Sequence, residues 1–111
     1  MIYAVFKSEN GRLCYCSVKG HAGFADAGHD IVCAAVSSAV QLTANLITES
    51  FHESADVSAD NNKIILSLKY PKSGSASLLL EGLFMHLQYL SEDYPNTITL
   101  KPQNSEVENN A

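Results

Sequence analysis

The strongest constraint on the fold is a repeated pattern in the sequence. Two strand–turn–strand segments occur, and each is followed by a long helical segment. The first segment turns at Asn10-Gly11, a dipeptide typical of two-residue β-hairpin loops. The second turns at Asn61-Asn62 and shows the alternation of apolar and polar residues expected of a strand that is half buried. The expected strands are Met1–Lys7, Arg12–Lys19, Ala55–Asp60 and Lys63–Tyr70.

Two segments have apolar residues at helical spacing, Ile31–Thr48 and Ser75–Glu92. Gly82 lies inside the second, where glycine is unfavourable, and this suggests close packing at that position. A last strand is expected over Asn96–Lys101. The order ββαββαβ predicts an α+β fold, a two-layer sandwich with two helices packed on one face of a mostly antiparallel sheet.

The length of 111 residues fits one domain, which we place at residues 1–102. Residues 103–111 are polar and acidic, and we expect a flexible tail there. A two-residue turn at Asn10-Gly11 would set Val5 opposite Cys16 and Tyr3 opposite Val18. That side of the first hairpin is expected to face the core.

The first helical segment, Ile31–Thr48, contains no charged side chain. Its apolar residues cover about half of the circumference, and the other face carries uncharged polar side chains: Ser37, Ser38, Gln41, Asn45 and Thr48. A face open to water ordinarily carries lysine or glutamate. We therefore expect a second copy of the chain to cover this face, as in a homodimer. The alternative is a face of small residues in contact with water.

Charge and composition exclude several classes of protein. The chain has 12 acidic residues against 7 lysines and arginines, a net charge of −5, which argues against nucleic acid or an anionic membrane as the main partner. No apolar run reaches about 18 residues, so no membrane-spanning helix is expected. The N-terminus shows no signal-peptide pattern, and the three cysteines are expected to be reduced thiols. These features predict a cytoplasmic protein.

The segment from Gly20 to Cys33 carries the candidate chemistry. Three glycines mark Gly20–His29 as a loop, and Asp30 is a suitable N-cap for the helix that follows. This arrangement places His21 at a strand exit and Cys33 in the first helical turn. The N-terminal end of a helix favours a thiolate and can receive an oxyanion. Because the helix dipole contributes only about 0.3–1 kcal/mol, a cationic partner is also needed, either His21 or His29.

These residues also resemble a known family. The run Gly20-His21-Ala22-Gly23, followed by Gly28 and then Asp30 through Ser37 (Asp-Ile-Val-Cys-Ala-Ala-Val-Ser), is similar to the ribosomal-processing cysteine protease Prp family, also called YsxB-like. Such proteins remove the N-terminal extension of large-subunit ribosomal protein twenty-seven and form homodimers. The resemblance therefore implies a thiol protease with no cofactor or metal, whose partner is that extension peptide.

Carried over position by position, the resemblance makes Cys33 the nucleophile and His21 the catalytic histidine. Asp30 and Ser37 become supporting residues of the site, and His29 receives no role. A mobile substrate loop is implied over Gly20–Gly28, which includes Ala22, Gly23 and Phe24.

Two other kinds of protein remain as alternatives. A metal site could use His21, His29 and Cys33 with a carboxylate from Asp30 or Asp26, although spacings of eight and four residues match no common zinc pattern. A non-enzymatic ribosome-assembly adaptor could instead use the dimer as a platform.

Overall fold

The structure is a computed structural model that describes residues 1–20, 27–69 and 74–103, with the backbone alone for residues 27–30, 102 and 103. Its elements follow the predicted ββαββαβ order, with one short π-helical turn (η1) continuing the first helix. They are β1 (Ile2–Glu9), β2 (Arg12–Lys19), α1 (Ala27–Asn45), η1 (Leu46–Ser50), β3 (Ala55–Asp60), β4 (Lys63–Leu68), α2 (Gly74–Asp93) and β5 (Ile98–Gln103).

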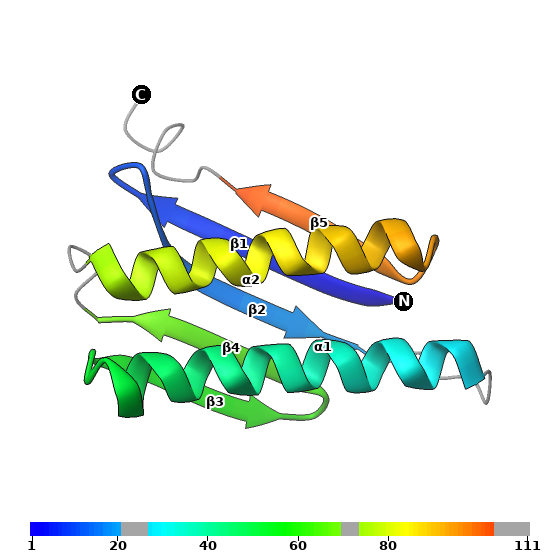
Figure 1. Ribbon diagram of the computed structural model, residues 1–111, viewed down its shortest axis with the longest axis horizontal. Coiled ribbons are helices and arrows are strands. Elements are labelled where there is room, and N and C mark those ends of the chain that lie inside the picture. The colour runs from blue at the N-terminus through cyan, green and yellow to red at the C-terminus, as the bar shows by residue number, and fades with distance from the viewer. Residues whose placement is uncertain (21–26, 70–73, 104–111) are drawn as a thin grey trace.

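The strands form one five-stranded sheet in the order β3-β4-β2-β1-β5. Three neighbouring pairs are antiparallel, and the pairing of β1 with β5 is parallel. Both helices lie on the same face of this sheet (Figure 1). The predicted two-layer α+β sandwich with a mostly antiparallel sheet is therefore confirmed.

The core lies between the sheet and the two helices. Its fully buried side chains include Phe6 and Leu66 from the sheet and Val32, Val40, Leu80 and Leu87 from the helices. The ring of Phe6 meets the ring of Phe84 edge to face, with centroids 5.1 Å apart and planes at 85°. Burial of each such side chain contributes about 1.5–3 kcal/mol, which makes this layer contact the main source of stability.

The Asn10-Gly11 turn forms as predicted, with positive φ angles of 56° and 79°. The predicted pairing along the hairpin is nevertheless wrong by one residue, because a β-bulge shifts the register after Lys7. Phe6 therefore pairs with Cys16, and Ala4 with Val18. A shift of one residue exchanges the faces of a strand, so the even-numbered residues of β1 face the core and Tyr3 is half exposed.

The first helix begins four residues earlier than predicted. Ala27–His29, which were expected to belong to the loop, already form helix, and Gly28 lies within it. Asp30 is therefore not the N-cap but a residue of the first turn. Negative charge is favourable there, because the partial positive charge of the helix start extends over that turn. The end of the predicted helix, Thr48, falls in η1.

The segment Ile31–Ser50 is long and apolar enough to cross a membrane by length and composition alone, although no spanning helix was expected. Its most apolar side, with Val32, Val36, Val40 and Ile47, is buried in the core. A core helix meets the same criteria, so the finding is a weak indication of a membrane span.

The second helix confirms the predicted apolar stripe, since Ala76, Leu80, Leu83 and Leu87 are buried. The interpretation of Gly82 is wrong. This glycine is exposed, and a Cβ atom added there would meet no atom within 4 Å. Close packing does not explain this glycine.

Gly20, by contrast, occupies a position that only glycine fits. Its φ is +92°, a left-handed backbone conformation, and an added Cβ would lie 2.8 Å from the carbonyl oxygen of Met1. Its N–H donates to the carbonyl oxygen of Asn62 over 2.9 Å. The end of β2 is thus held between the start of β1 and the β3–β4 turn.

The two glycines give opposite expected effects on stability. Gly20→Ala should lower the free energy of unfolding by at least about 1–3 kcal/mol, the cost of a strained backbone, and more through overlap with the Met1 carbonyl. Gly82→Ala should raise it by up to about 1 kcal/mol, because alanine favours the helix. Urea unfolding followed by circular dichroism measures both. A Gly20→Ala variant as stable as the parent would contradict the close approach of Gly20 to the Met1 carbonyl.

Candidate active site

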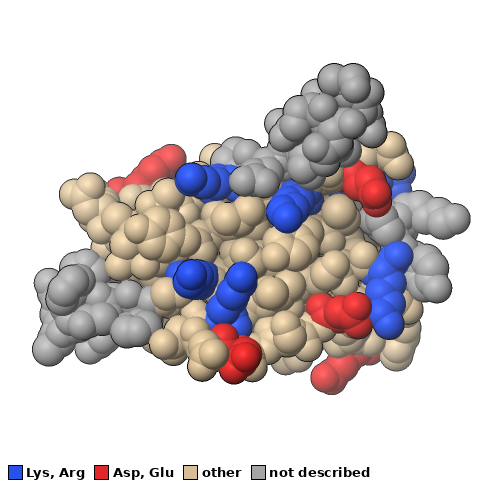
Figure 2. Space-filling model, turned by 180° about the vertical axis from the view of Figure 1, so that it is seen from behind, with Lys and Arg blue, Asp and Glu red and all other residues tan. Residues whose placement is uncertain are grey.

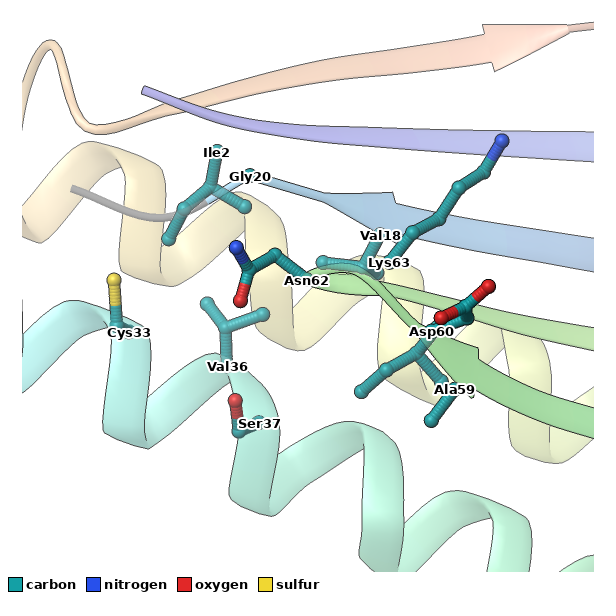
Figure 3. Close-up of a pocket in the computed structure, with 11 residues that line it drawn as sticks. Ile2, Val18, Gly20, Cys33, Val36, Ser37, Ala59, Asp60, Asn62 and Lys63 are labelled. Carbon is teal, nitrogen blue, oxygen red and sulfur yellow. The ribbon is translucent and has the colours of Figure 1, made fainter. Parts of the chain in front are cut away.

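A cleft opens between α1 and the edge of the sheet where β2 ends. Its volume is about 180 Å³. Residues from α1, from the end of β2 and from the β3–β4 turn form most of its wall (Figure 3). They are Ile2, Val18, Gly20, Cys33, Val36, Ser37, Ala59, Asp60, Asn62, Lys63 and Ile64.

On the helix side, Cys33 and Ser37 line the cleft one turn apart. Residues four apart lie on the same face of a helix, so the predicted pairing of these two positions is confirmed. Cys33 is partly buried, Ser37 is exposed, and Val36 between them is buried in the core. The thiol therefore sits at the boundary between an apolar floor and open solvent, where a substrate can reach it.

On the sheet side, the wall is the β3–β4 turn. Asn61 and Asn62 have φ angles of 49° and 64°, left-handed conformations that asparagine tolerates. The Asn62 amide points into the cleft, whereas the charged ends of Asp60 and Lys63 point away from Cys33 (Figure 3). The sequence identified this turn but gave no sign that Asn62 would line the same cleft as Cys33, because that arrangement depends on the packing of α1 on the sheet.

The early start of α1 changes the electrostatic setting of the thiol. Free N–H groups belong to the first turn of a helix, which here spans residues 27–30, so Cys33 lies in the second turn and not in the first. The influence of the helix dipole falls off within one turn. The start of the helix therefore contributes less to the electrostatic setting of Cys33 than the sequence suggested.

The structure brings Gly20, Cys33 and Ser37 together, and it places Gly28 and Asp30 in the first turn of α1. The predicted residues His21, Ala22, Gly23 and Phe24 lie outside the described residues. The alternative of a metal site depends on His21 and Asp26, which lie outside the described residues. It also depends on His29 and Asp30, of which the structure describes only the backbone. Among the side chains that the structure does describe, no three His, Cys, Asp or Glu residues form a metal-binding group.

The other two thiols lie on β2, in different surroundings. Cys16 is only 1% exposed, and this burial raises the pKa of its thiol to about 12. Cys14 is partly buried at the bulge, where it is the extra residue of β2 between the partners of Lys7 and Ser8. Neither of these two thiols lines the cleft, whereas Cys33 does.

Comparisons with known proteins identify relatives along most of the chain. The family model described as cysteine protease Prp matches residues 1–99. A Bacillus subtilis protein, the ribosomal processing cysteine protease Prp, is 30% identical over 87 residues, which cover 71% of this chain and 76% of that protein.

Two crystal structures of the essential ribosomal processing protease Prp from Staphylococcus aureus share the fold. One, in complex with a substrate peptide, has a TM-score of 0.86 at 25% identity. The other, in complex with a covalently linked product peptide, has a TM-score of 0.83 at 26% identity. Each match covers 93% of this chain and 100% of the other.

The different environments of the three thiols predict an order of reactivity. Iodoacetamide near neutral pH should modify Cys33 first, Cys14 more slowly, and Cys16 only after unfolding, because the raised pKa and burial of Cys16 keep it protonated and shielded. Peptide mapping by mass spectrometry at successive times measures the order, with protein in denaturant as the control. Equal rates for Cys33 and Cys14 in the folded protein would contradict a special setting for Cys33.

Proposed function

The chain belongs to the cysteine protease Prp family, and we propose that it is the endopeptidase that removes the N-terminal extension of large-subunit ribosomal protein twenty-seven, acting through a dyad of Cys33 and His21. As a member of that family it is a cysteine protease of ribosomal protein processing. The observation that carries the proposal is the position of Cys33, partly exposed on a cleft, in a fold shared with a protease that is known with a covalently linked product peptide.

In the proposed reaction, Cys33 Sγ attacks the carbonyl carbon of the scissile peptide bond. The protonated His21 ring gives its proton to the nitrogen of the leaving amine as the C–N bond breaks. Water then gives a proton to the now neutral ring and attacks the acyl carbon; the C–S bond breaks, the carboxylate product leaves, and the thiolate of Cys33 and the protonated His21 are restored. N–H groups of the first turn of α1 would stabilise the tetrahedral oxygen, because those groups are free of helical partners.

The junction at Gly20 supports His21 as the partner of Cys33. His21 is the next residue in the chain, and Gly20 lines the same cleft as the thiol. Gly20 is also held by the hydrogen bond from its N–H to the Asn62 carbonyl oxygen, and the Met1 carbonyl leaves no room for a side chain beside it. Because the backbone is held at Gly20, the His21 imidazole has fewer accessible positions, and less entropy is lost when it pairs with Cys33.

Ser37 and Asp30 are proposed as supporting residues. The exposed Ser37 hydroxyl can bond to a peptide group of a substrate lying along the cleft. Asp30 lies one turn before Cys33 and would orient the His21 ring. The substrate loop is proposed to end before Ala27, where α1 starts.

We also propose that the enzyme is a homodimer and acts in the cytoplasm. The polar face of α1 is exposed at Ser38, Gln41 and Asn45, as the homodimer hypothesis requires. Leu42 beside them is 60% exposed, and Ile31 at the other end of the helix is 56% exposed. An uncharged surface with exposed large apolar side chains is typical of an interface between subunits.

Removal of either member of the dyad should stop cleavage. Cys33→Ala and His21→Ala should each lower kcat by about a thousandfold or more, measured by mass spectrometry on the ribosomal protein with its extension. Cys14→Ala and His86→Ala are matched controls, because neither residue lines the cleft. Unchanged circular dichroism would show that the fold is kept. Full activity of either dyad variant would remove the assignment.

The homodimer can be tested by the mass in solution. Multi-angle light scattering should give about twice the mass of one chain. Leu42→Glu should shift the mass toward that of one chain, because it places a charge in the proposed interface, whereas Leu78→Glu, on the exposed side of α2, should not. A parent protein that is monomeric at high concentration would show that the α1 face is in contact with water.

A further inference from the structure

The net charge of −5 conceals an uneven distribution of lysines. The sequences of α1, η1 and α2 contain neither lysine nor arginine. Lysines gather instead on the face of the sheet that is turned away from the helices, where they surround an uncharged centre (Figure 2). They are Lys7 on β1, Lys19 on β2, Lys63 on β4 and Lys101 on β5.

The ladder register shows why these side chains share one face. Lys19 pairs with Tyr3 across β1 and β2, and Lys101 pairs with Val5 across β1 and β5. Tyr3, Val5 and Lys7 alternate along β1 with residues that are buried beneath the helices. Paired residues project to the same side of a sheet, so the lysines of four strands point away from the core together.

Carboxylates on this face of the described chain stand at its rim. Asp56 and Asp60 belong to the edge strand β3, and Asp56 forms an ion pair of 3.4 Å with Lys69. Glu9 lies at the end of the first hairpin, opposite Arg12. The middle of the face thus keeps a local positive charge although the whole chain is acidic.

Aromatic rings lie among the lysines. Tyr3 is 50% exposed. The ammonium group of Lys7 lies 4.7 Å from the centre of the Tyr15 ring. Lys19 and Lys63, which pair across β2 and β4, line a hollow of about 460 Å³ together with one carboxylate, that of Asp60 on the edge strand. This face combines cations for phosphate groups with flat rings on which a planar base can stack.

We propose that the open face of the sheet, defined by Tyr3, Lys7, Tyr15, Lys19, Lys63 and Lys101, binds single-stranded nucleic acid. Lysines spread over several strands match the spaced phosphates of an extended backbone, and exposed aromatic rings on a sheet hold bases by stacking. The Tyr15 ring already holds the Lys7 ammonium group, but an acidic polypeptide would use the lysines and leave the exposed ring of Tyr3 without a role. The face lies on the opposite side of the sheet from the helices. Of its six residues only Lys63 also belongs to the wall of the cleft, and its charged end points away from Cys33, so binding there does not use the groups proposed for proteolysis.

The contribution of the lysines can be tested with the variant Lys7→Gln, Lys19→Gln and Lys101→Gln. Fluorescence anisotropy with a uridine oligomer of about 16 nucleotides should show about tenfold weaker binding at about 50 mM salt. The slope of log K against log salt should fall by about 2, since three phosphate contacts are lost. The matched control, Met85→Glu with His86→Glu and Gln88→Glu, changes the net charge comparably on exposed α2 and should bind as the parent does.

The contribution of stacking is tested separately. Tyr3→Ser should weaken binding by about five- to a hundredfold, whereas Tyr3→Phe should keep it, because the ring remains. The affinity for a thymidine oligomer of the same length, compared with that for the uridine oligomer, shows whether the face prefers single-stranded DNA or RNA.

Three outcomes would overturn the proposal: parent protein that does not bind either oligomer at low salt, a lysine variant that binds as tightly as the parent, or a polyglutamate peptide that binds as tightly as the oligomers. Cleavage of the extended ribosomal protein should be unchanged in the lysine variant, because none of its three positions lines the cleft. A failed binding test with intact cleavage therefore counts against this inference alone.

Discussion

The junction at Gly20 is the contact on which the site depends. Gly20 directly follows β2, has no room for a side chain because of the Met1 carbonyl, and donates its N–H to the β3–β4 turn. Three segments that are distant in sequence meet at this point. Since Gly20 and Asn62 both line the cleft, the same contact that closes this edge of the sheet also fixes the wall opposite Cys33.

The parts of the fold that depend on local sequence could be predicted. The Asn-Gly turn, the apolar stripes of the two helices and the order of elements all follow from patterns within a few residues. The motif from Gly20 to Ser37 also placed the thiol and the serine on one helical face. These features are local, and tertiary packing reinforced them.

The parts that depend on three-dimensional packing could not be predicted. The bulge after Lys7 leaves no mark in the composition, yet it reversed which side of β1 faces the core. The early start of α1 adds a turn rich in loop-forming residues, Gly28 and Asp30 among them, and this moved Cys33 from the first turn to the second. Asn62 became part of the cleft only because α1 packs against the sheet beside it.

The pairing of β1 with β5 has a consequence for the order of events during synthesis. Ile2 and Ile98 are neighbours in the sheet, although almost the whole chain separates them. Ile2 is also a wall of the cleft, and its N–H donates to the carbonyl oxygen of Thr97. During synthesis, one edge of β1 therefore stays unpaired until β5 has left the ribosome. A nascent chain interrupted before β5 would lack the partner that holds this wall, so the cleft should be complete only after β5 has been synthesised.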